Sequence, residues 1–206
     1  MSAAVENSYW LPFTANRDFN KRPRVISGAE GHWYTTTDGT RLYDTFSGLW
    51  TCGLGHCHPR IVEAVQKQVA KLDYCMSFQV TNNKALELAE RATALAPDGI
   101  SRCFFTNSGS ESVDTALKIA LGYHRARGEG NRTRLIGREK GYHGVNFGGM
   151  SVGGIVPNRK VFSAAMIPGV DHLRHTLDIE HNAFSRGLPE HGIELAEDLE
   201  RLCALH

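Results

Sequence analysis

The stretch Phe104-Phe105-Thr106-Asn107-Ser108-Gly109-Ser110-Glu111-Ser112 decides the fold that the sequence predicts. Its first residues belong to a compact apolar and β-branched run, Arg102 to Thr106, which is too short for a helix and is typical of a buried strand. Farther on, the apolar residues recur at the spacing of one helix face. They are Val113, Ala116, Leu117, Ala120 and Leu121. The sequence therefore predicts a strand, a tight polar turn and a helix.

The polar turn has the composition of an anion-binding site. Ser108 or Ser110 can cap the helix, and Glu111 is an acid in its first turn. The first backbone N–H groups of a helix have no partners inside it, and the positive end of the helix dipole lies there. Gly109 lets the backbone approach a ligand closely. Two interpretations are open: a cradle for a dianionic phosphate, or an ordinary capped helix, which is the more common arrangement.

Composition narrows the class of protein. The chain has 206 residues with 41% apolar and 22% charged residues and a formal net charge of +1, which is the range of a globular domain with a real core. No stretch is basic enough to indicate nucleic acid, none is apolar enough to span a membrane, and the first residues do not resemble a signal peptide. The cysteines are odd in number and irregularly spaced, which favours a reduced, cytoplasmic protein. They are Cys52, Cys57, Cys75, Cys103 and Cys203.

The first part of the chain predicts an arm followed by a small sheet. Residues 1–22 show little periodicity but contain the apolar knot Trp10-Leu11-Pro12-Phe13-Thr14, which either packs onto the core or contributes to a pocket rim. Residues 24–46 alternate as short strands, with the hairpin signal Thr37-Asp38-Gly39-Thr40. We expect a small antiparallel meander here.

A glycine-rich loop, residues 47–59, follows the meander and contains Trp50. A large aromatic residue in such a loop either walls a pocket or fills a gap in the core. The run His56-Cys57-His58 invites a zinc interpretation, but adjacent ligands on one extended segment cannot all face one ion. We predict no metal site, and we expect Pro59 to begin a helix.

The second part of the chain predicts alternating strands and helices. A helix is expected after Asn82 or Asn83, and a strand over Thr133 to Gly137 leads directly into Gly141-Tyr142-His143-Gly144. This order is typical of a doubly wound α/β sheet, in which ligands lie beyond the carboxyl ends of the strands. The two polar turns should therefore be neighbours. Residues 146–154 show no strong period, and residues 155–191 are expected to be mostly loop, with short helices near Val161 and His181.

Three stretches together resemble the class III aminotransferases, which are fold-type I enzymes that use pyridoxal 5′-phosphate (PLP): Thr106 to Ser112, Gly141 to Gly144, and Asp44 to Pro59. The chain is most similar to the ω-amino acid–pyruvate and β-alanine–pyruvate aminotransferases, as its Pro12-Phe13-Thr14 arm and Trp50 suggest. The resemblance covers essentially all 206 residues and favours the phosphate cradle over the ordinary capped helix. It implies an arm and small-domain segment over residues 1–75. Residues 76–206 would be the first part of an incomplete large PLP-binding domain.

The resemblance also implies roles for individual residues. The phosphate of PLP would be held by Ser108, Gly109 and Ser110. Tyr142 would stack on the pyridine ring, and His143 would lie beside it, either with a direct role or as a residue of the turn. The substrate pocket would be lined by Phe13, Trp50, Phe78 and Tyr142, with Phe78 reaching the pocket of the neighbouring subunit. The full-length enzyme would be a homodimer or tetramer.

The Schiff-base lysine, the acid beside the pyridine nitrogen and the carboxylate-binding arginine of the family lie downstream of the region that this chain matches. None of the seven lysines stands in the family's lysine context, and Lys140 belongs to the Tyr-His turn. They are Lys21, Lys67, Lys71, Lys84, Lys118, Lys140 and Lys160. We therefore expect no catalytic residue here.

The chain is accordingly predicted to be the N-terminal half of an enzyme that moves an amino group from an ω-amino acid (β-alanine) or an amine to a 2-oxo acid, pyruvate. The alternatives are another class III PLP enzyme, such as a decarboxylase or an aminomutase, and a non-catalytic fragment.

Overall fold

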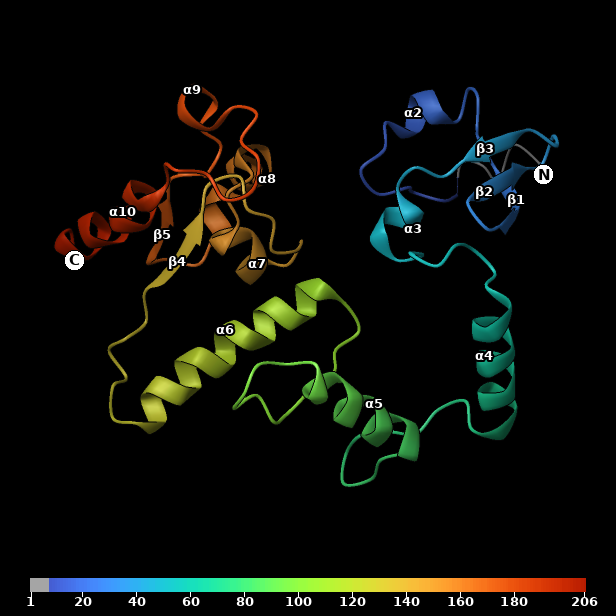
Figure 1. Cartoon of the computed structure of the whole chain (residues 1–206), viewed down its shortest axis with the longest axis horizontal. Helices are drawn as coiled ribbons and strands as arrows, with labels where there is room; N and C mark the ends of the chain where they lie inside the picture. The colour runs from blue at the N-terminus through green and yellow to red at the C-terminus, as the bar shows by residue number, and fades with distance from the viewer. Residues whose placement is uncertain (1–7) are drawn as a thin grey trace. The chain divides into compact units, whose positions relative to one another are not determined.

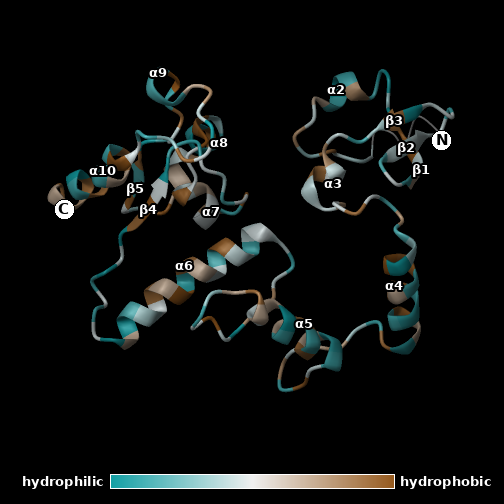
Figure 2. Ribbon diagram, viewed as in Figure 1, coloured by the Kyte–Doolittle hydropathy of each residue, from teal (hydrophilic) through white to brown (hydrophobic). Residues whose placement is uncertain are grey.

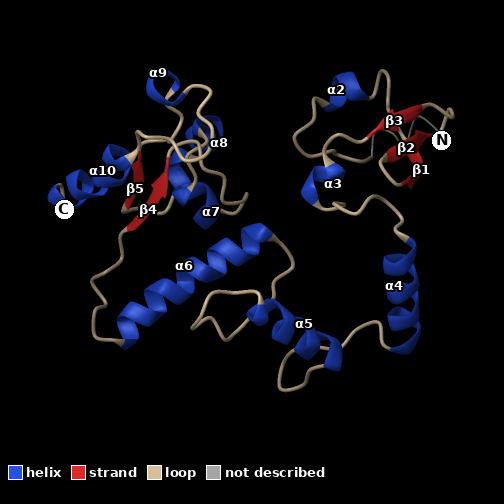
Figure 3. Ribbon diagram, viewed as in Figure 1, coloured by secondary structure: helices blue, strands red, loops and turns tan. Residues whose placement is uncertain are grey.

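A computed structural model of the chain describes residues 8–206. The chain divides into two compact units, Met1–Arg91 and Ala92–His206. Figure 1 shows the order of their elements along the chain, and Figure 3 separates helices from strands.

The first unit contains the expected antiparallel meander. Its strands β1 (Ile26–Glu30), β2 (Trp33–Thr36) and β3 (Arg41–Tyr43) pair in the order β1-β2-β3. Between β2 and β3 the Asp-Gly turn forms as predicted, with Gly39 at a φ of 84°. The short helix α2 (Asn16–Phe19) precedes the sheet, and the turn labelled α3 (Ser47–Trp50) follows it.

Two amphipathic helices come next, and both were predicted. Helix α4 (Pro59–Lys71) begins with the proline at its first turn, where the missing N–H costs nothing. In α5 (Asn83–Ala94) the Asn82 side chain caps the start by accepting a 3.0 Å hydrogen bond from the N–H of Ala85. The ribbon of α4 carries apolar and polar residues side by side in Figure 2. Its apolar face is exposed, with Val65 at 55% and Val69 at 57%.

The second unit is built on two parallel strands. Strand β4 (Leu135–Arg138) pairs with β5 (Val170–Leu173), with Leu135 opposite Val170. The other elements of the unit are α6 (Gly109–Ala126), α7 (Phe147–Val152), α8 (Val156–Val161), the 3-10 turn η1 (Ser163–Ala165), α9 (Ile179–Asn182) and α10 (Ile193–Ala204). Helix α7 packs on α6 and on both strands, and α10 packs on β5. The buried apolar side chains are Val152, Leu195 and Leu202.

The expected strand over Arg102 to Thr106 is wrong. The described structure has no strand in this segment, and the Phe104 and Phe105 side chains are exposed. A strand needs a neighbour to take its ladder hydrogen bonds, and no strand of the described residues lies beside this one.

Two short elements, α7 and β5, were not predicted from the sequence. The helix α7 lies in the glycine-rich segment, where four buried residues pack tightly: Gly148, Gly149, Ser151 and Val152. Strand β5 lies in a region expected to be loop. Its four residues, Val-Asp-His-Leu, contain polar side chains that carry little strand signal, and only the pairing with β4 establishes it.

Candidate functional site

The start of α6 forms as the sequence predicts, and Ser108 is its cap. The Ser108 hydroxyl accepts a 3.1 Å hydrogen bond from the N–H of Glu111. The Glu111 carboxylate reaches back and accepts a 2.9 Å bond from the N–H of Asn107. This reciprocal pair resembles a capping box and fixes the direction in which the helix leaves the turn. The acid of the first turn is thus directed at Asn107.

The second polar turn lies directly against this helix start, as expected. The Ser110 hydroxyl accepts a 3.0 Å hydrogen bond from the N–H of Val145. Gly144 has a φ of 106°, and a Cβ there would stand 2.6 Å from the Cα of Ser110. Only glycine permits so close an approach. One turn farther along α6, the Asp114 carboxylate accepts a 2.8 Å bond from the N–H of Gly149.

The residues present fit a phosphate group. Within the described residues, the backbone N–H groups of Gly109 and Ser110 have no hydrogen-bond acceptor. A Cβ placed on Gly109 would meet no atom within 4 Å, so the turn is uncrowded on that side of the Gly109 backbone. The Ser110 hydroxyl oxygen accepts the hydrogen bond from the N–H of Val145, and the hydroxyl proton stays free to donate. Unpaired amides, a hydroxyl donor and the positive end of an 18-residue helix are the groups that bind a dianion.

The Tyr142 ring is available beside this turn. It is 59% exposed, and the Gly141–Gly144 segment that carries it is held by a hydrogen bond from the N–H of Gly154 to the carbonyl of Gly141. His143 is half-buried and folds back, since a Cβ on Gly141 would lie 3.2 Å from its Nε2 atom. His143 is thus a half-buried residue of the turn, and the Tyr142 side chain is exposed beside it.

The other three aromatic residues proposed for the substrate pocket belong to the first unit. The side chains of Phe13, Trp50 and Phe78 are all exposed. Ser110 belongs to the second unit, and the proximity of these residues to its turn stays a prediction. The expectation that Phe78 reaches the pocket of a neighbouring subunit also stays a prediction.

Trp50 sits on an unusual backbone. Four consecutive residues, Ser47 to Trp50, have φ values of 49°, 60°, 61° and 68°, which is a left-handed turn. It is closed by hydrogen bonds from the N–H of Trp50 to the carbonyl of Phe46, 2.8 Å, and from that of Thr51 to Ser47, 2.9 Å. The left-handed conformation costs about 1–2 kcal/mol for each non-glycine residue. Such backbone strain clusters at functional sites.

A buried carboxylate lies under this turn, and the sequence analysis assigned it no role. Asp44 accepts a hydrogen bond of 2.8 Å from Nε2 of His56, with side-chain exposures of 6% and 12%. This hydrogen bond, with others from backbone N–H groups of the turn, holds the pKa of Asp44 below its usual value. Burial, together with the charge of Asp44, raises the pKa of the neighbouring Tyr34. The available signal was the spacing of Asp44 and Gly48, which suits a side chain that caps a turn.

This network also accounts for the histidine-rich segment. His56 is bonded to Asp44, Cys57 is exposed, and His58 stands at the start of α4. No three His, Cys, Asp or Glu side chains among residues 8–206 are grouped so as to hold a metal ion. Within the same residues, no helix is both long and apolar enough to cross a bilayer.

Comparison with known proteins identifies the family. Residues 14–204 match the aminotransferase class-III family, and the chain belongs to it. Over 97% of its length the chain is 54% identical to an omega-aminotransferase of Caulobacter vibrioides and 48% identical to an omega-amino acid–pyruvate aminotransferase of Pseudomonas putida. It spans about 45% of the length of these relatives.

Solved structures give the same fold. The chain matches an (S)-enantioselective omega-transaminase from Thermomicrobium roseum with a TM-score of 0.87 and 29% identity over 98% of this chain and 45% of that one. It matches an omega-transaminase from Pseudomonas jessenii in complex with PMP with a TM-score of 0.86 and 28% identity, over 100% and 46%. The chain therefore has the N-terminal part of the fold-type I transaminase architecture, and the cofactor of its family is PLP.

Proposed function

We propose that the chain is the N-terminal part of a PLP-dependent transaminase that moves an amino group from an ω-amino acid, such as β-alanine, or an amine to pyruvate. The observation that carries this proposal is the 54% and 48% identity to two ω-aminotransferases along nearly the whole chain. A third relative, from Pseudomonas aeruginosa, is named a beta-alanine–pyruvate aminotransferase and is 48% identical.

The site residues take distinct parts in this proposal. The free amides of Gly109 and Ser110, with the hydroxyl of Ser110, bind the phosphate of PLP, and Ser108 orients them by capping α6. Tyr142 covers one face of the pyridine ring, and His143 supports the turn that carries it. When bound, PLP supplies the electron sink that makes the amino carbon of the substrate acidic. The chain's own residues hold and orient that group.

The remaining groups are assigned to the longer parent protein. The Schiff-base lysine, the acid beside the pyridine nitrogen and the arginine for the substrate carboxylate are proposed to lie in sequence that follows residue 206. Phe13 and Trp50 would wall the substrate pocket, and Phe78 would reach the pocket of a second subunit in a homodimer or tetramer. We place the boundary between the small-domain segment and the large domain near residue 75. A cytoplasmic location fits the five free cysteines.

The test compares the parent protein with the isolated chain. The parent should convert β-alanine and pyruvate faster than it converts an amine donor with 2-oxoglutarate. The 206-residue chain should show no turnover with either pair. Decarboxylation or amino-group migration by the parent would favour another class III PLP enzyme. If sequencing past the codon for His206 met an early stop, without an aspartate-ended strand and a later Lys-Gly, the non-catalytic fragment would be favoured.

A second experiment tests the phosphate site without any turnover. PLP added to the parent protein should be retained on dialysis, and replacement of Ser110 by alanine should weaken that retention by about tenfold, as expected for one lost bond to a charged group. Ser101→Ala, which removes an exposed hydroxyl outside the turn, is the matched control. Equal retention by all three proteins would contradict the assignment.

A further inference from the structure

The left-handed turn from Ser47 to Trp50 is held from below by one carboxylate. Oδ1 of Asp44 accepts a 3.0 Å hydrogen bond from the N–H of Phe46, and Oδ2 accepts a 2.7 Å bond from the N–H of Gly48. These two amides flank Ser47, where the backbone enters the left-handed region. Among residues 8–206 no other run of four consecutive residues has positive φ values. One side chain thus accepts the backbone N–H groups on both sides of Ser47.

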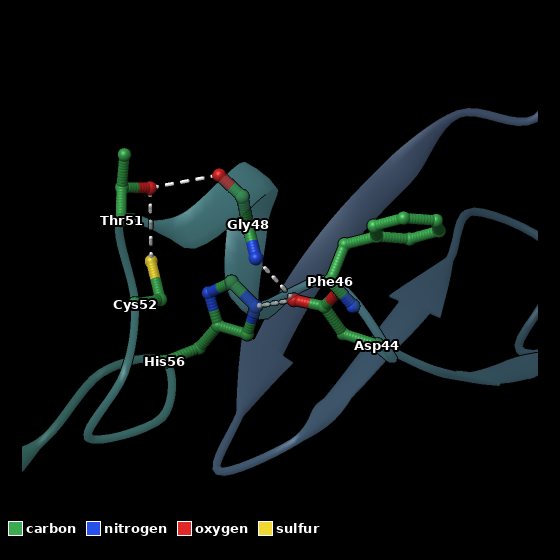
Figure 4. A network of polar contacts seen from close by, with 6 residues as sticks. All are labelled: Asp44, Phe46, Gly48, Thr51, Cys52 and His56. Carbon is green, nitrogen blue, oxygen red and sulfur yellow. Dashed lines mark hydrogen bonds and ion pairs between the residues drawn. The ribbon is translucent and has the colours of Figure 1, made fainter. Parts of the chain in front are cut away.

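His56 fixes the direction of that carboxylate. Its Nε2 donates to Oδ2, the same oxygen that accepts the N–H of Gly48, and Figure 4 shows both bonds meeting at Asp44. On its other side the His56 ring lies 4.4 Å from the ring of Tyr34, measured between centroids. The imidazole is therefore held between the sheet and the carboxylate.

The loop is also anchored at both ends to the meander. At its start the N–H of Asp44 donates a 2.8 Å bond to the carbonyl of His32. At its end His56 and Gly31 exchange two backbone hydrogen bonds of 2.7 and 3.1 Å. A Cβ on Gly55 would lie 3.0 Å from the carbonyl oxygen of Gly31, so the two segments are in close contact. Both ends of the loop are thus bonded to the sheet, and the residues with left-handed backbone lie between them.

This scaffold presents a side chain that takes no part in the scaffold. Trp50 is 80% exposed, and no aromatic or cationic partner for its ring is found among the described residues. A hydrogen-bonded carboxylate with little exposed area and a strained backbone thus support an exposed indole. A turn that served only to connect β3 with α4 would need neither of them.

We infer that Asp44, oriented by His56, is the positioning residue for Trp50: the pair holds the left-handed turn and so fixes the direction of the indole toward the amino donor. This inference rests on the proposed transaminase function for its kinetic consequence. Asp44 and His56 do not touch the substrate. They set how well Trp50 discriminates among donors and leave the chemical step to other groups.

The first test follows Trp50 itself, without activity. Phe replacements of Trp10 and Trp33 leave Trp50 as the one tryptophan of the chain. Time-resolved fluorescence anisotropy then separates nanosecond local motion of the indole from tumbling of the whole particle. In Asp44→Ala and His56→Ala the amplitude of local motion should rise. In His56→Gln, which keeps a side-chain N–H donor, it should return most of the way to the parent value.

The matched control is Asp38→Ala. The Asp38 carboxylate also accepts hydrogen bonds from a hydroxyl and a backbone N–H in the same meander, from Thr36 and Thr40, but it has no contact with the turn. The Asp38→Ala variant should leave the local motion of the Trp50 indole unchanged. Circular dichroism shows whether each variant folds, and if Asp44→Ala does not, His56→Ala decides the test. Unchanged anisotropy in the folded variants would overturn the inference.

The second test uses the full-length parent enzyme. Asp44→Ala should raise KM for the amino donor by about tenfold and change kcat by less than about threefold, because a displaced pocket wall weakens binding in the ground state and transition state alike. Retention of PLP should not change. An unchanged KM would overturn the inference. If the parent has no transaminase activity, the proposed function fails, while the anisotropy of Trp50 still decides whether the pair holds the turn.

Discussion

The hydroxyl of Ser110 and the backbone N–H of Val145 lie 3.0 Å apart, although 35 residues separate them in the chain. This hydrogen bond joins the start of α6 to the turn that carries Tyr142. The two parts of the proposed cofactor site are therefore held together within one unit, by a residue that we propose also binds the phosphate of PLP through its N–H and its hydroxyl. Changes at Ser110 should affect stability and cofactor binding together.

Replacement of Ser110 by alanine should lower the free energy of unfolding of the chain by about 1 kcal/mol, because the N–H of Val145 loses its acceptor. Urea denaturation followed by circular dichroism measures the change. Ser101→Ala again serves as the control and should alter the midpoint very little. Equal midpoints for the two variants would show that the bond to Val145 contributes no net stability.

Replacement of Gly144 by alanine should be more damaging than replacement of Gly128. Both glycines have positive φ, at 106° and 80°, so both variants strain the backbone. At Gly144, however, the new Cβ would also meet Ser110 at 2.6 Å, whereas at Gly128 it would meet nothing within 4 Å. We expect losses of about 3 kcal/mol and about 1 kcal/mol, respectively. The difference in urea midpoint between the two variants measures the cost of the contact between Gly144 and Ser110. Equal losses for both variants would show that Gly144 does not lie so close to Ser110.

The local parts of this fold could be predicted from the sequence, and the long-range parts could not. The Ser108 cap, the proline at the start of α4 and the Asp-Gly hairpin depend on neighbours within a few residues, so residue type was sufficient. The strand expected over 102–106 failed because a strand also needs a partner, and β5 was missed because its partner β4 lies 35 residues earlier.

In the candidate site too, the local features could be predicted from the sequence and a long-range pairing could not. The capped polar turn at Ser108 was predicted from its residue types, and its proximity to the Tyr142 turn from the order of elements, whereas its binding of phosphate stays a prediction. The pairing of Asp44 with His56 could not be predicted from periodicity, because it depends on a left-handed backbone that residue types alone do not specify. Ser47, Leu49 and Trp50 all disfavour that conformation.

Acid should destabilise the first unit through Asp44. Its pKa is lower in the folded chain than the usual value of about 3.9, chiefly because His56 donates a hydrogen bond to it, so the folded state favours the charged carboxylate. The resulting stability is present above the unfolded pKa and is lost as the pH falls through about 4 and below. Unfolding free energies measured from pH 6 to pH 3 should fall less steeply for Asp44→Asn than for the parent chain. Identical slopes would contradict this linkage.

The exposed apolar face of α4 should make the isolated chain self-associate. Val65 and Val69 are both more than half exposed and lie one turn apart on a 13-residue helix, and Ile61 continues the same face one turn earlier. Contiguous apolar surface of this kind favours association in water. We expect size-exclusion chromatography with light scattering to show oligomers whose mass rises with concentration.

The double variant Val65→Lys, Val69→Lys should shift this equilibrium toward the monomer, because two lysine ammonium groups cannot be buried in an apolar contact without a large desolvation penalty. Gln66→Lys, Ala70→Lys has the same spacing and the same added charge on a neighbouring face of the helix, and it should shift the equilibrium less. If both double variants dissociate the oligomer equally, net charge and not the apolar face governs association. A monomeric parent chain at all concentrations would show that the apolar face of α4 does not drive association at all.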